Sequence, residues 1–247
     1  MDRMVYLAMS AAKHAMRAQS VATNNLANAS TTGFKADLAA VRAMPVFGPG
    51  HPSRVFAMAE RPGTDLAPGS LQTTGNDLDI AINGDGYLAV IAPDGTEAYT
   101  RAGELKLTVN GQLQTSAGHP VLGNGGPIAL PQFDSMVIGV DGTISVRPLG
   151  QEANTLAQVD RIKLVRPQAD LLRKGADGLL RLEDGSNAPI DAGVRITRGA
   201  LEESNVNPVT EMINIISHAR RYEMAVKAMA SAQQMDAAAG RLLMMGG

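Results

Sequence analysis

Histidine side chains are the first candidates for acid–base or metal chemistry in this chain, and their spacing supports neither. No two of the four histidines stand four residues apart, the spacing that places two zinc ligands on one face of a helix. They are His14, His51, His119 and His218. We therefore expect solvated or interface histidines and no metal site.

Two short motifs resemble the start of ligand-binding loops, but the residues that follow lack the ligands or glycines that such loops require. Asp77 and Asp79 match the opening of a calcium loop, but the next ligand position is Ala81 and the turn-glycine position is Ile82. The segment 84–86, Gly-Asp-Gly, lacks the further glycines that open a helix in a phosphate-binding loop. We interpret it as a tight turn.

Catalytic nucleophiles are equally absent from the sequence patterns. Cysteine does not occur, and no Gly-x-Ser-x-Gly motif is present. The acidic pairs at 183–184 and 202–203 fall in or near expected turns. We therefore predict no catalytic residues, no cofactor and no enzymatic role.

Composition narrows the class of protein further. The 247 residues carry 22 Lys+Arg against 24 Asp+Glu, a net charge of −2 that argues against nucleic-acid binding by bulk charge. With 45% hydrophobic residues the chain can fold, but only 3% are aromatic, so its core must come from aliphatic side chains, Met and Ala. We expect a folded protein with closely approaching backbones.

No membrane span or cleaved signal is expected. No run approaches the roughly 18 apolar residues of a spanning helix, and the first 30 residues show no compact apolar stretch with a cleavage site. Residues 3–36 contain basic but no acidic side chains, which superficially resembles an organelle transit peptide. That alternative is the weaker one.

Two long helices are predicted at the ends of the chain. Residues 4–28 contain no Pro or Gly and end in an Asn- and Gly-containing cluster that suits a helix terminus. The second helix is predicted from Pro208 to about Leu243, with Asn207 as its N-cap and Glu211 near the positive end of the helix dipole. Both helices are long for a compact domain.

Each helix carries a narrow seam of residues that alternate in steps of three and four, as in a coiled coil. Either the helices form a hairpin within one chain, or they build a coiled coil from several chains. Polar residues in and beside the seams, together with abundant Met, favour specific contacts between chains. The predicted subunit interface comprises Val5, Ala8, Ala12, Ala15, Gln19, Ala22, Asn24, Asn25, Leu26, Asn28, Met212, Ile215, Ile216, Ala219, Tyr222, Val226, Met229 and Gln233.

The middle of the chain reads as antiparallel β structure. Six Asn-Gly or Asp-Gly dipeptides punctuate strand-length runs, at 83–84, 94–95, 110–111, 141–142, 177–178 and 184–185. Before them, residues 44–74 are rich in Pro and Gly, so helix is improbable and an extended arm is expected.

The predicted fold is a discontinuous α+β one, with the terminal helices in a coiled-coil domain and a central, mainly antiparallel β domain. Its expected parts are an N-terminal helix at 1–34, an extended arm at 35–75, the β domain at 76–200 and a C-terminal helix at 201–247.

Three ordered segments carry a resemblance to a known family. They are Asn24–Lys35 (NNLANASTTGFK), residues 74–87 (TGNDLDIAINGDGY) with Tyr99–Gly103 beyond, and residues 199–207 (GALEESNVN) followed by Arg220–Glu223 and Lys227. Together they resemble the bacterial flagellar axial proteins, and the chain lacks room for the outer domains of the hook members. The opening Met1-Asp2 and residues 38–46 are most similar to the proximal rod proteins of type F, with the distal rod proteins of type G as the close alternative.

The resemblance implies a structural subunit of the flagellar basal-body rod, exported unfolded by the type III apparatus and polymerised into the drive shaft that crosses the periplasm. Its implied partners are proximal rod types B and C, distal rod type G and further copies of itself, with no nucleic acid and no membrane insertion. A periplasmic enzyme or a soluble adaptor of the same machine is the alternative of a different class.

Overall fold

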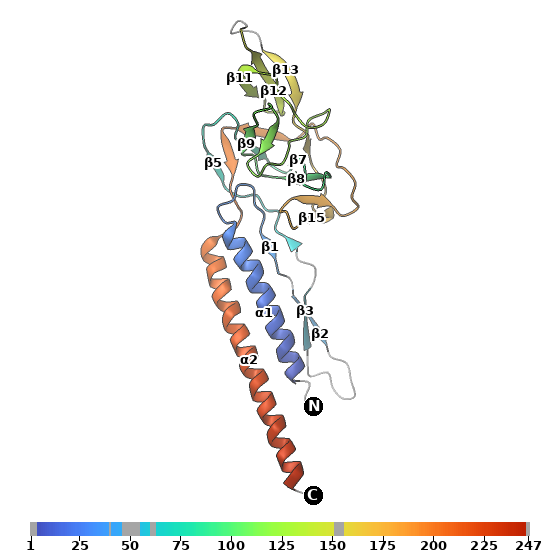
Figure 1. Ribbon diagram of the computed structural model, residues 1–247, viewed down its shortest axis with the longest axis vertical. Helices are drawn as coiled ribbons and strands as arrows, with labels where there is room; N and C mark the ends of the chain where they lie inside the picture. Colours follow the sequence, from blue (N-terminus) through green and yellow to red (C-terminus); the bar gives the residue numbers. More distant parts are fainter. Residues whose placement is uncertain (1–3, 40, 46–54, 60–62, 151–155, 246–247) are drawn as a thin grey trace. The chain divides into compact units, whose positions relative to one another are not determined.

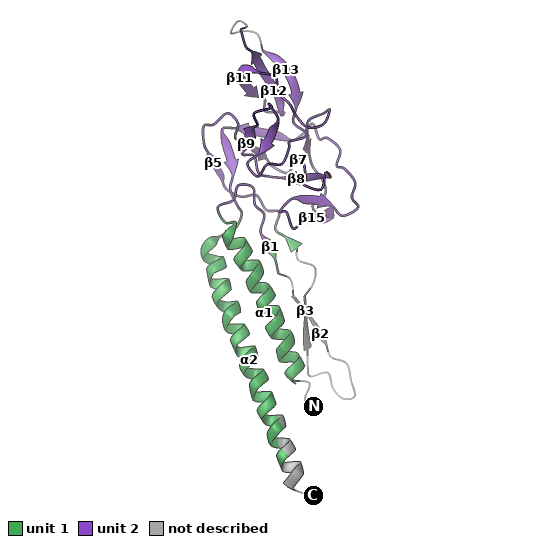
Figure 2. Ribbon diagram, in the orientation of Figure 1, with its two compact units in different colours: residues 1–29, 37–65, 206–247 green, residues 30–36, 66–205 purple. Residues whose placement is uncertain are grey.

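The protein folds into two compact units of an α+β architecture (Figure 2). The computed structural model describes residues 4–39, 41–45, 55–59, 63–150 and 156–245. The helical unit comprises residues 1–29, 37–65 and 206–247, and the β unit comprises residues 30–36 and 66–205. The expected boundaries after residues 34, 75 and 200 stay predictions, while the chain passes between the units at 29/30, 36/37, 65/66 and 205/206.

Helix α1 spans Met4–Ala27, as the unbroken run without Pro or Gly predicts. Beyond its last turn the side-chain amide of Asn28 donates to the carbonyl of Asn24 at 2.9 Å, and the Asn28 backbone N–H donates to the same oxygen at 3.1 Å. These bonds satisfy a carbonyl that a helix end leaves without a partner. Gly33 then adopts φ +67°, a left-handed conformation that glycine tolerates best.

Helix α2 spans Pro208–Met245 and begins as its sequence predicts. The side-chain oxygen of Asn207 accepts hydrogen bonds from the N–H groups of Val209 at 3.0 Å and Thr210 at 3.2 Å. Pro208 occupies the first helical position, where its missing N–H costs nothing, and Glu211 lies in the first turn. The predicted N-cap is confirmed.

Within the helical unit, α1 and α2 lie side by side with both chain termini at the same end, so they are antiparallel (Figure 1). The rest of the unit holds two short antiparallel ladders. These are β1 (Asp37–Leu38) with β4 (Gly63–Thr64), and β2 (Val41–Pro45) with β3 (Val55–Ala59). The Pro- and Gly-rich arm is thus strand and loop wherever it is described, and its residues 46–54 and 60–62 lie outside the described part.

The β unit is built from antiparallel sheets. A five-stranded sheet has the order β14-β7-β8-β16-β15, a three-stranded sheet has the order β11-β12-β13, and three further ladders pair β17 with β6, β18 with β5 and β10 with β9. The strands are β5 (Leu71–Thr73), β6 (Ile80–Asn83), β7 (Tyr87–Ile91), β8 (Glu97–Thr100), β9 (Leu105–Leu107), β10 (Leu113–Thr115), β11 (Phe133–Ile138), β12 (Thr143–Pro148), β13 (Ala157–Arg161), β14 (Leu164–Val165), β15 (Leu172–Lys174), β16 (Leu180–Leu182), β17 (Arg195–Arg198) and β18 (Ala200–Glu202), with a 3-10 turn at Ala169–Leu171.

The six predicted turns all place glycine at positive φ, but only four of them join paired strands. The dipeptides at 94–95, 110–111, 141–142 and 177–178 connect β7 to β8, β9 to β10, β11 to β12 and β15 to β16. The expectation of a hairpin at Asn83-Gly84 is wrong, because β6 pairs with β17 instead of β7. The turn at 184–185 likewise leads out of β16 without forming a hairpin.

Aliphatic side chains fill the core of the β unit, as the shortage of aromatics requires. Ile80, Leu88, Val90, Ile128 and Ile144 are completely buried. Burying each such side chain contributes about 1.5–3 kcal/mol relative to leaving it exposed. This unit therefore holds a hydrophobic core made by its own residues.

Gly103 offers a test of how tightly this core is closed. A Cβ at this position would lie 1.7 Å from the carbonyl oxygen of Ile80, whose N–H bonds back to the Gly103 carbonyl at 3.0 Å. We expect Gly103→Ala to destabilise the protein by about 3 kcal/mol, lowering Tm by roughly 6–12 °C. Gly125→Ala is the matched control, because nothing lies within 4 Å of the added methyl group. Equal Tm values for both variants in calorimetry would contradict this account.

Candidate subunit interface on the terminal helices

A groove of about 950 Å³ runs between α1 and α2 in the helical unit. Alanine is the most frequent residue along its walls, and the alanines include Ala8, Ala15 and Ala22 of α1 and Ala225 and Ala228 of α2. Small side chains let the helix backbones approach, but each buries little area. The two helices therefore hold each other through a thin apolar contact.

The buried face of α1 follows the predicted seam. Of the predicted positions, Ala8, Ala12, Ala15 and Ala22 are buried, whereas Val5, Gln19 and Leu26 are half-buried. Ala18 is also buried, but the predicted seam does not contain it, because that seam passes through the neighbouring polar residue Gln19. The seam on α1 is thus engaged within its own chain.

On α2 the residues that line the groove belong to a different stripe from the predicted seam. The groove-lining stripe contains Glu211, Asn214, His218, Arg221, Ala225 and Ala228, again in steps of three and four, and ends at the buried Ala232. It is displaced by one residue from the predicted seam, which corresponds to about 100° around the helix. The predicted seam is left largely uncovered: Met212, Tyr222, Val226 and Gln233 are exposed, and Ile215, Ala219 and Met229 are half-buried.

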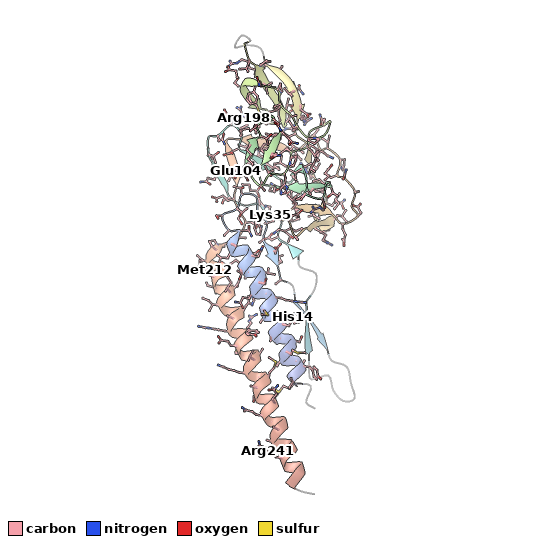
Figure 3. The ribbon with its side chains drawn as sticks, in the orientation of Figure 1. His14, Lys35, Glu104, Arg198, Met212 and Arg241 are labelled. Carbon is pink, nitrogen blue, oxygen red and sulfur yellow. The ribbon has the colours of Figure 1, made fainter. Side chains whose placement is uncertain are left out.

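Large apolar side chains on both helices remain in contact with solvent in the single chain. The side chains more than half exposed are Tyr6, Met9 and Met16 on α1 and Val209, Met212, Ile213, Ile216, Met224 and Met235 on α2. Figure 3 marks Met212 on the first turns of α2 and His14 on α1. Exposed apolar patches of this kind mark protein–protein contact sites. Ile213 and Val209 are further candidates for the predicted interface. The signal in the sequence was their spacing, with Ile213 three residues before Ile216 and Val209 four residues before Ile213.

Helix α2 is also longer than α1. At 1.5 Å per residue, the 24 residues of α1 span about 36 Å and the 38 residues of α2 span about 57 Å. The last buried residue described on α2 is Ala232, and Gln233, Gln234 and Met235 beyond it are exposed. The C-terminal turns of α2 therefore extend past the surface that α1 covers.

The predicted asparagines divide between local and longer contacts. Asn25 is buried, and its side-chain amide pairs with the backbone of Asp37, donating to the carbonyl at 2.9 Å and accepting from the N–H at 2.9 Å. The amide thus holds the strand β1 as a neighbouring strand would. Asn28 ends the helix as described above, and the Asn24 side chain is exposed.

Of the titratable residues that line the groove, His218 has a pKa that its surroundings shift. Partial burial, together with the positive charge of Arg221, lowers the pKa of His218, and Glu211 opposes the shift. The neutral form of the imidazole is therefore stabilised relative to that of a free histidine. His14 lines the same groove from α1.

The remaining sequence candidates have structural roles or lie elsewhere. The Asp79 carboxylate accepts hydrogen bonds from Thr74 at 2.7 Å and Asn76 at 3.1 Å, so it stabilises a turn. His119 lies in the β unit, and His51 falls outside the described residues. Within the described ranges, no group of three or more His, Asp or Glu side chains is placed to hold a metal ion, and no helix is long and apolar enough to cross a membrane.

Comparison with protein families finds three matches in chain order. Residues 6–35 match the model described as flagella basal body rod protein, and residues 81–146 match the flagellar hook protein FlgE/F/G D1 domain. Residues 197–242 match the flagellar basal body rod FlgEFG protein C-terminal model. The first and last matches fall largely on α1 and α2, and the middle one falls on the β unit.

Individual relatives cover nearly the whole chain. The flagellar basal-body rod protein FlgF of Salmonella typhimurium is 44% identical over 251 residues, covering 99% of this chain and 100% of the relative. FlgF of Escherichia coli gives the same identity and coverage. FlgG of Buchnera aphidicola from Schizaphis graminum is 34% identical and covers 87% of this chain and 90% of the relative.

These relatives are structural rod proteins by name, which agrees with helices that expose apolar faces and with the absence of catalytic motifs in the sequence. The predicted family is confirmed, and type F is favoured over type G by identity and by coverage. The chain belongs to the FlgF family of flagellar basal-body rod proteins and is a non-enzymatic structural subunit of that rod, with other rod proteins as its partners.

Proposed function

We propose that this chain is a subunit of the proximal rod and joins the shaft through coiled-coil contacts between its terminal helices and those of neighbouring subunits. The observation that carries the proposal is the set of apolar side chains on α2 that α1 leaves more than half exposed. A helix that is apolar on more than one face needs more than one neighbour. One neighbour is α1 of the same chain, and the others come from adjacent subunits.

Contacts of this kind generate a shaft when they do not close on themselves. The stripe of α2 that lines the groove differs from the stripe that is exposed, and we infer that a neighbour meets the exposed stripe with a different surface of its own. Such heterologous contacts build helical filaments rather than closed dimers. We infer that the helices form the inner tube and the β unit an outer layer, and that torque passes through the assembled helices toward hook and filament.

The partners follow from this place in the shaft. We infer contacts with proximal rod types B and C, with distal rod type G and with copies of the same chain, all within the periplasm. Export through the flagellar type III apparatus in an unfolded state is consistent with a chain that has no cysteine and hence no disulfide to form before assembly. The exposed apolar faces would be covered only after delivery.

Ile216 tests the interface directly. It is exposed on α2, so Ile216→Asp should leave the β unit's thermal transition unchanged and should remove an apolar contact with a neighbour at a cost of about 1.5–3 kcal/mol plus the burial of a charge. We expect loss of complete rods in electron micrographs of basal bodies and loss of swimming. Val109→Asp, at a fully exposed apolar position of the β unit, is the control and should assemble normally. Normal rods with Ile216→Asp would refute the interface.

Asn25 tests whether the strand after α1 must be held for assembly. Asn25→Leu removes both side-chain bonds to the part-buried backbone N–H and carbonyl of Asp37, a cost of about 1–3 kcal/mol. We expect faster hydrogen exchange at the Asp37 amide and impaired rod assembly, with the β unit still folded. Asn24→Leu, at the exposed neighbouring position, should leave the Asp37 amide unchanged. Unchanged exchange in Asn25→Leu would contradict the role of this pairing.

A further inference from the structure

The chain passes between its two units four times, and the β-unit ends of these passages lie in three short segments. We call them the connecting segments: residues 30–36, residues 66–70 and residues 201–205. They are far apart in sequence, and all of them belong to the β unit. Independent flexible linkers would show few bonds among themselves, whereas these segments are extensively bonded.

Lys35 and Glu202 form the centre of these bonds. The Lys35 ammonium donates to the Glu202 carboxylate at 2.6 Å and to the Ala67 carbonyl at 2.8 Å, so one side chain bonds both other segments. The same Glu202 oxygen accepts the N–H of Gly69 at 3.1 Å. Both charged side chains are almost fully buried, with exposed fractions of 3% for Lys35 and 1% for Glu202.

Asn205 adds a second, uncharged cross-link. Its side-chain oxygen accepts the N–H of Ala36 at 2.8 Å, and its side-chain nitrogen donates to the Ala67 carbonyl at 3.2 Å. Backbone bonds continue the pattern, from the Gly33 N–H to the Glu202 carbonyl at 2.7 Å and from the Asn205 N–H to the Phe34 carbonyl at 3.4 Å. Every pair of connecting segments is thus joined.

The joined segments are also fixed to the core of the β unit. The second oxygen of Glu202 accepts a hydrogen bond from Arg101 at 2.9 Å, and Arg101 donates to the Gly84 carbonyl at 2.7 Å. The Arg101 guanidinium lies 5.1 Å from the centre of the Tyr87 ring, a cation–π distance, and Tyr87 belongs to β7 of the five-stranded sheet. Glu202 therefore ties the connecting segments to the sheet.

Glycines make this close approach possible. A Cβ at Gly33 would lie 2.3 Å from the backbone nitrogen of Ala102, and a Cβ at Gly69 would lie 2.0 Å from the carbonyl of Glu203. A side chain at Gly69 would push two connecting segments apart, and one at Gly33 would push the first segment away from residues 101–102.

Stability alone does not account for the arrangement, since a buried ion pair is often no more stabilising than apolar residues of similar volume. We propose that Lys35, Glu202 and Asn205 are positioning residues that bind the three connecting segments into one load-sharing joint. Force that reaches the β unit along one connection is then shared among all of them and passed to the sheet. This inference rests on the proposed torque-bearing function of the chain.

Coupling among the segments is measurable on the purified full-length protein by hydrogen exchange. Asn205→Ala removes the side-chain bonds to Ala36 and Ala67. If the segments act as one joint, the amides of Gly33 and Gly69, which Asn205 does not contact, should also exchange about tenfold faster. If only the Ala36 amide changes, the segments are independent and the proposal is overturned.

A second variant and a control complete the exchange experiment. Lys35→Met should accelerate the amides of Gly33, Ala36 and Asn205, none of which it bonds. Lys163→Met is the matched control, because Lys163 forms a 2.8 Å ion pair with Glu97 in the same unit and bonds none of the connecting segments. If Lys35→Met fails to fold, the uncharged Asn205→Ala variant still decides the question. Faster exchange at these amides in the control would overturn the assignment.

In cells, different measurements test the load-sharing joint and the proposed function. We expect Asn205→Ala to leave the number of complete rods unchanged while lowering the torque of tethered motors at high load more than at low load. Normal torque at every load would overturn the load-sharing role. Complete rods in a strain that lacks the chain altogether would refute the proposed function, whereas the exchange result would still report on the coupling.

Discussion

Helix α2 presents more apolar surface than α1 can cover, and the character of the helical unit follows from this mismatch. The groove between the helices is lined by alanines of both helices and by polar residues of α2, so it brings backbones close while burying little apolar area. Large residues such as Ile213, Ile216 and Met224 remain exposed on α2. Since helices gain most of their stability from tertiary contacts, our proposal is that neighbouring subunits complete this pair.

The β unit follows the opposite rule. Its sheets close around fully buried aliphatic residues such as Leu88 and Ile144, and its tight turns place glycines where positive φ is required. The β unit thus buries its apolar side chains within its own core, whereas the helical unit leaves several of its own exposed. This difference in burial is what our proposal assigns to contacts with neighbouring subunits.

The sequence predicted the buried face of α1, where a single hydrophobic pattern is present. It did not single out the groove-lining face of α2, where several patterns fit equally well. The α1 seam was predictable because alanines recur at a single three- and four-residue register. On α2, apolar residues occur on several faces, so the register through Met212 looked better than the one through Glu211 and His218 that lines the groove. The polar residues of the groove-lining stripe favoured the apolar register, because a polar stripe rarely faces a helix partner. The predicted seam on α2 stays a prediction for contacts between subunits.

The turns also show that a local pattern predicts local structure only. An Asn-Gly dipeptide reports local backbone geometry, so the positive φ of Gly84 was predictable. It does not report which strands pair, and β6 finds its partner in β17, more than a hundred residues later. Non-local pairing depends on the whole chain, and no local pattern encodes it.

Glu202 shows what the three resembling segments share physically. Lys35 lies in the first, Arg101 in the second and Glu202 in the third, and the structure brings them to one carboxylate although Lys35 and Glu202 are 167 residues apart. In sequence, nothing predicted that these three charges would meet. A buried carboxylate bonded by two cations tolerates few substitutions, because removing either partner leaves a charge without compensation in a site away from water. In this chain the three resembling segments therefore meet, at these positions, in one ion cluster.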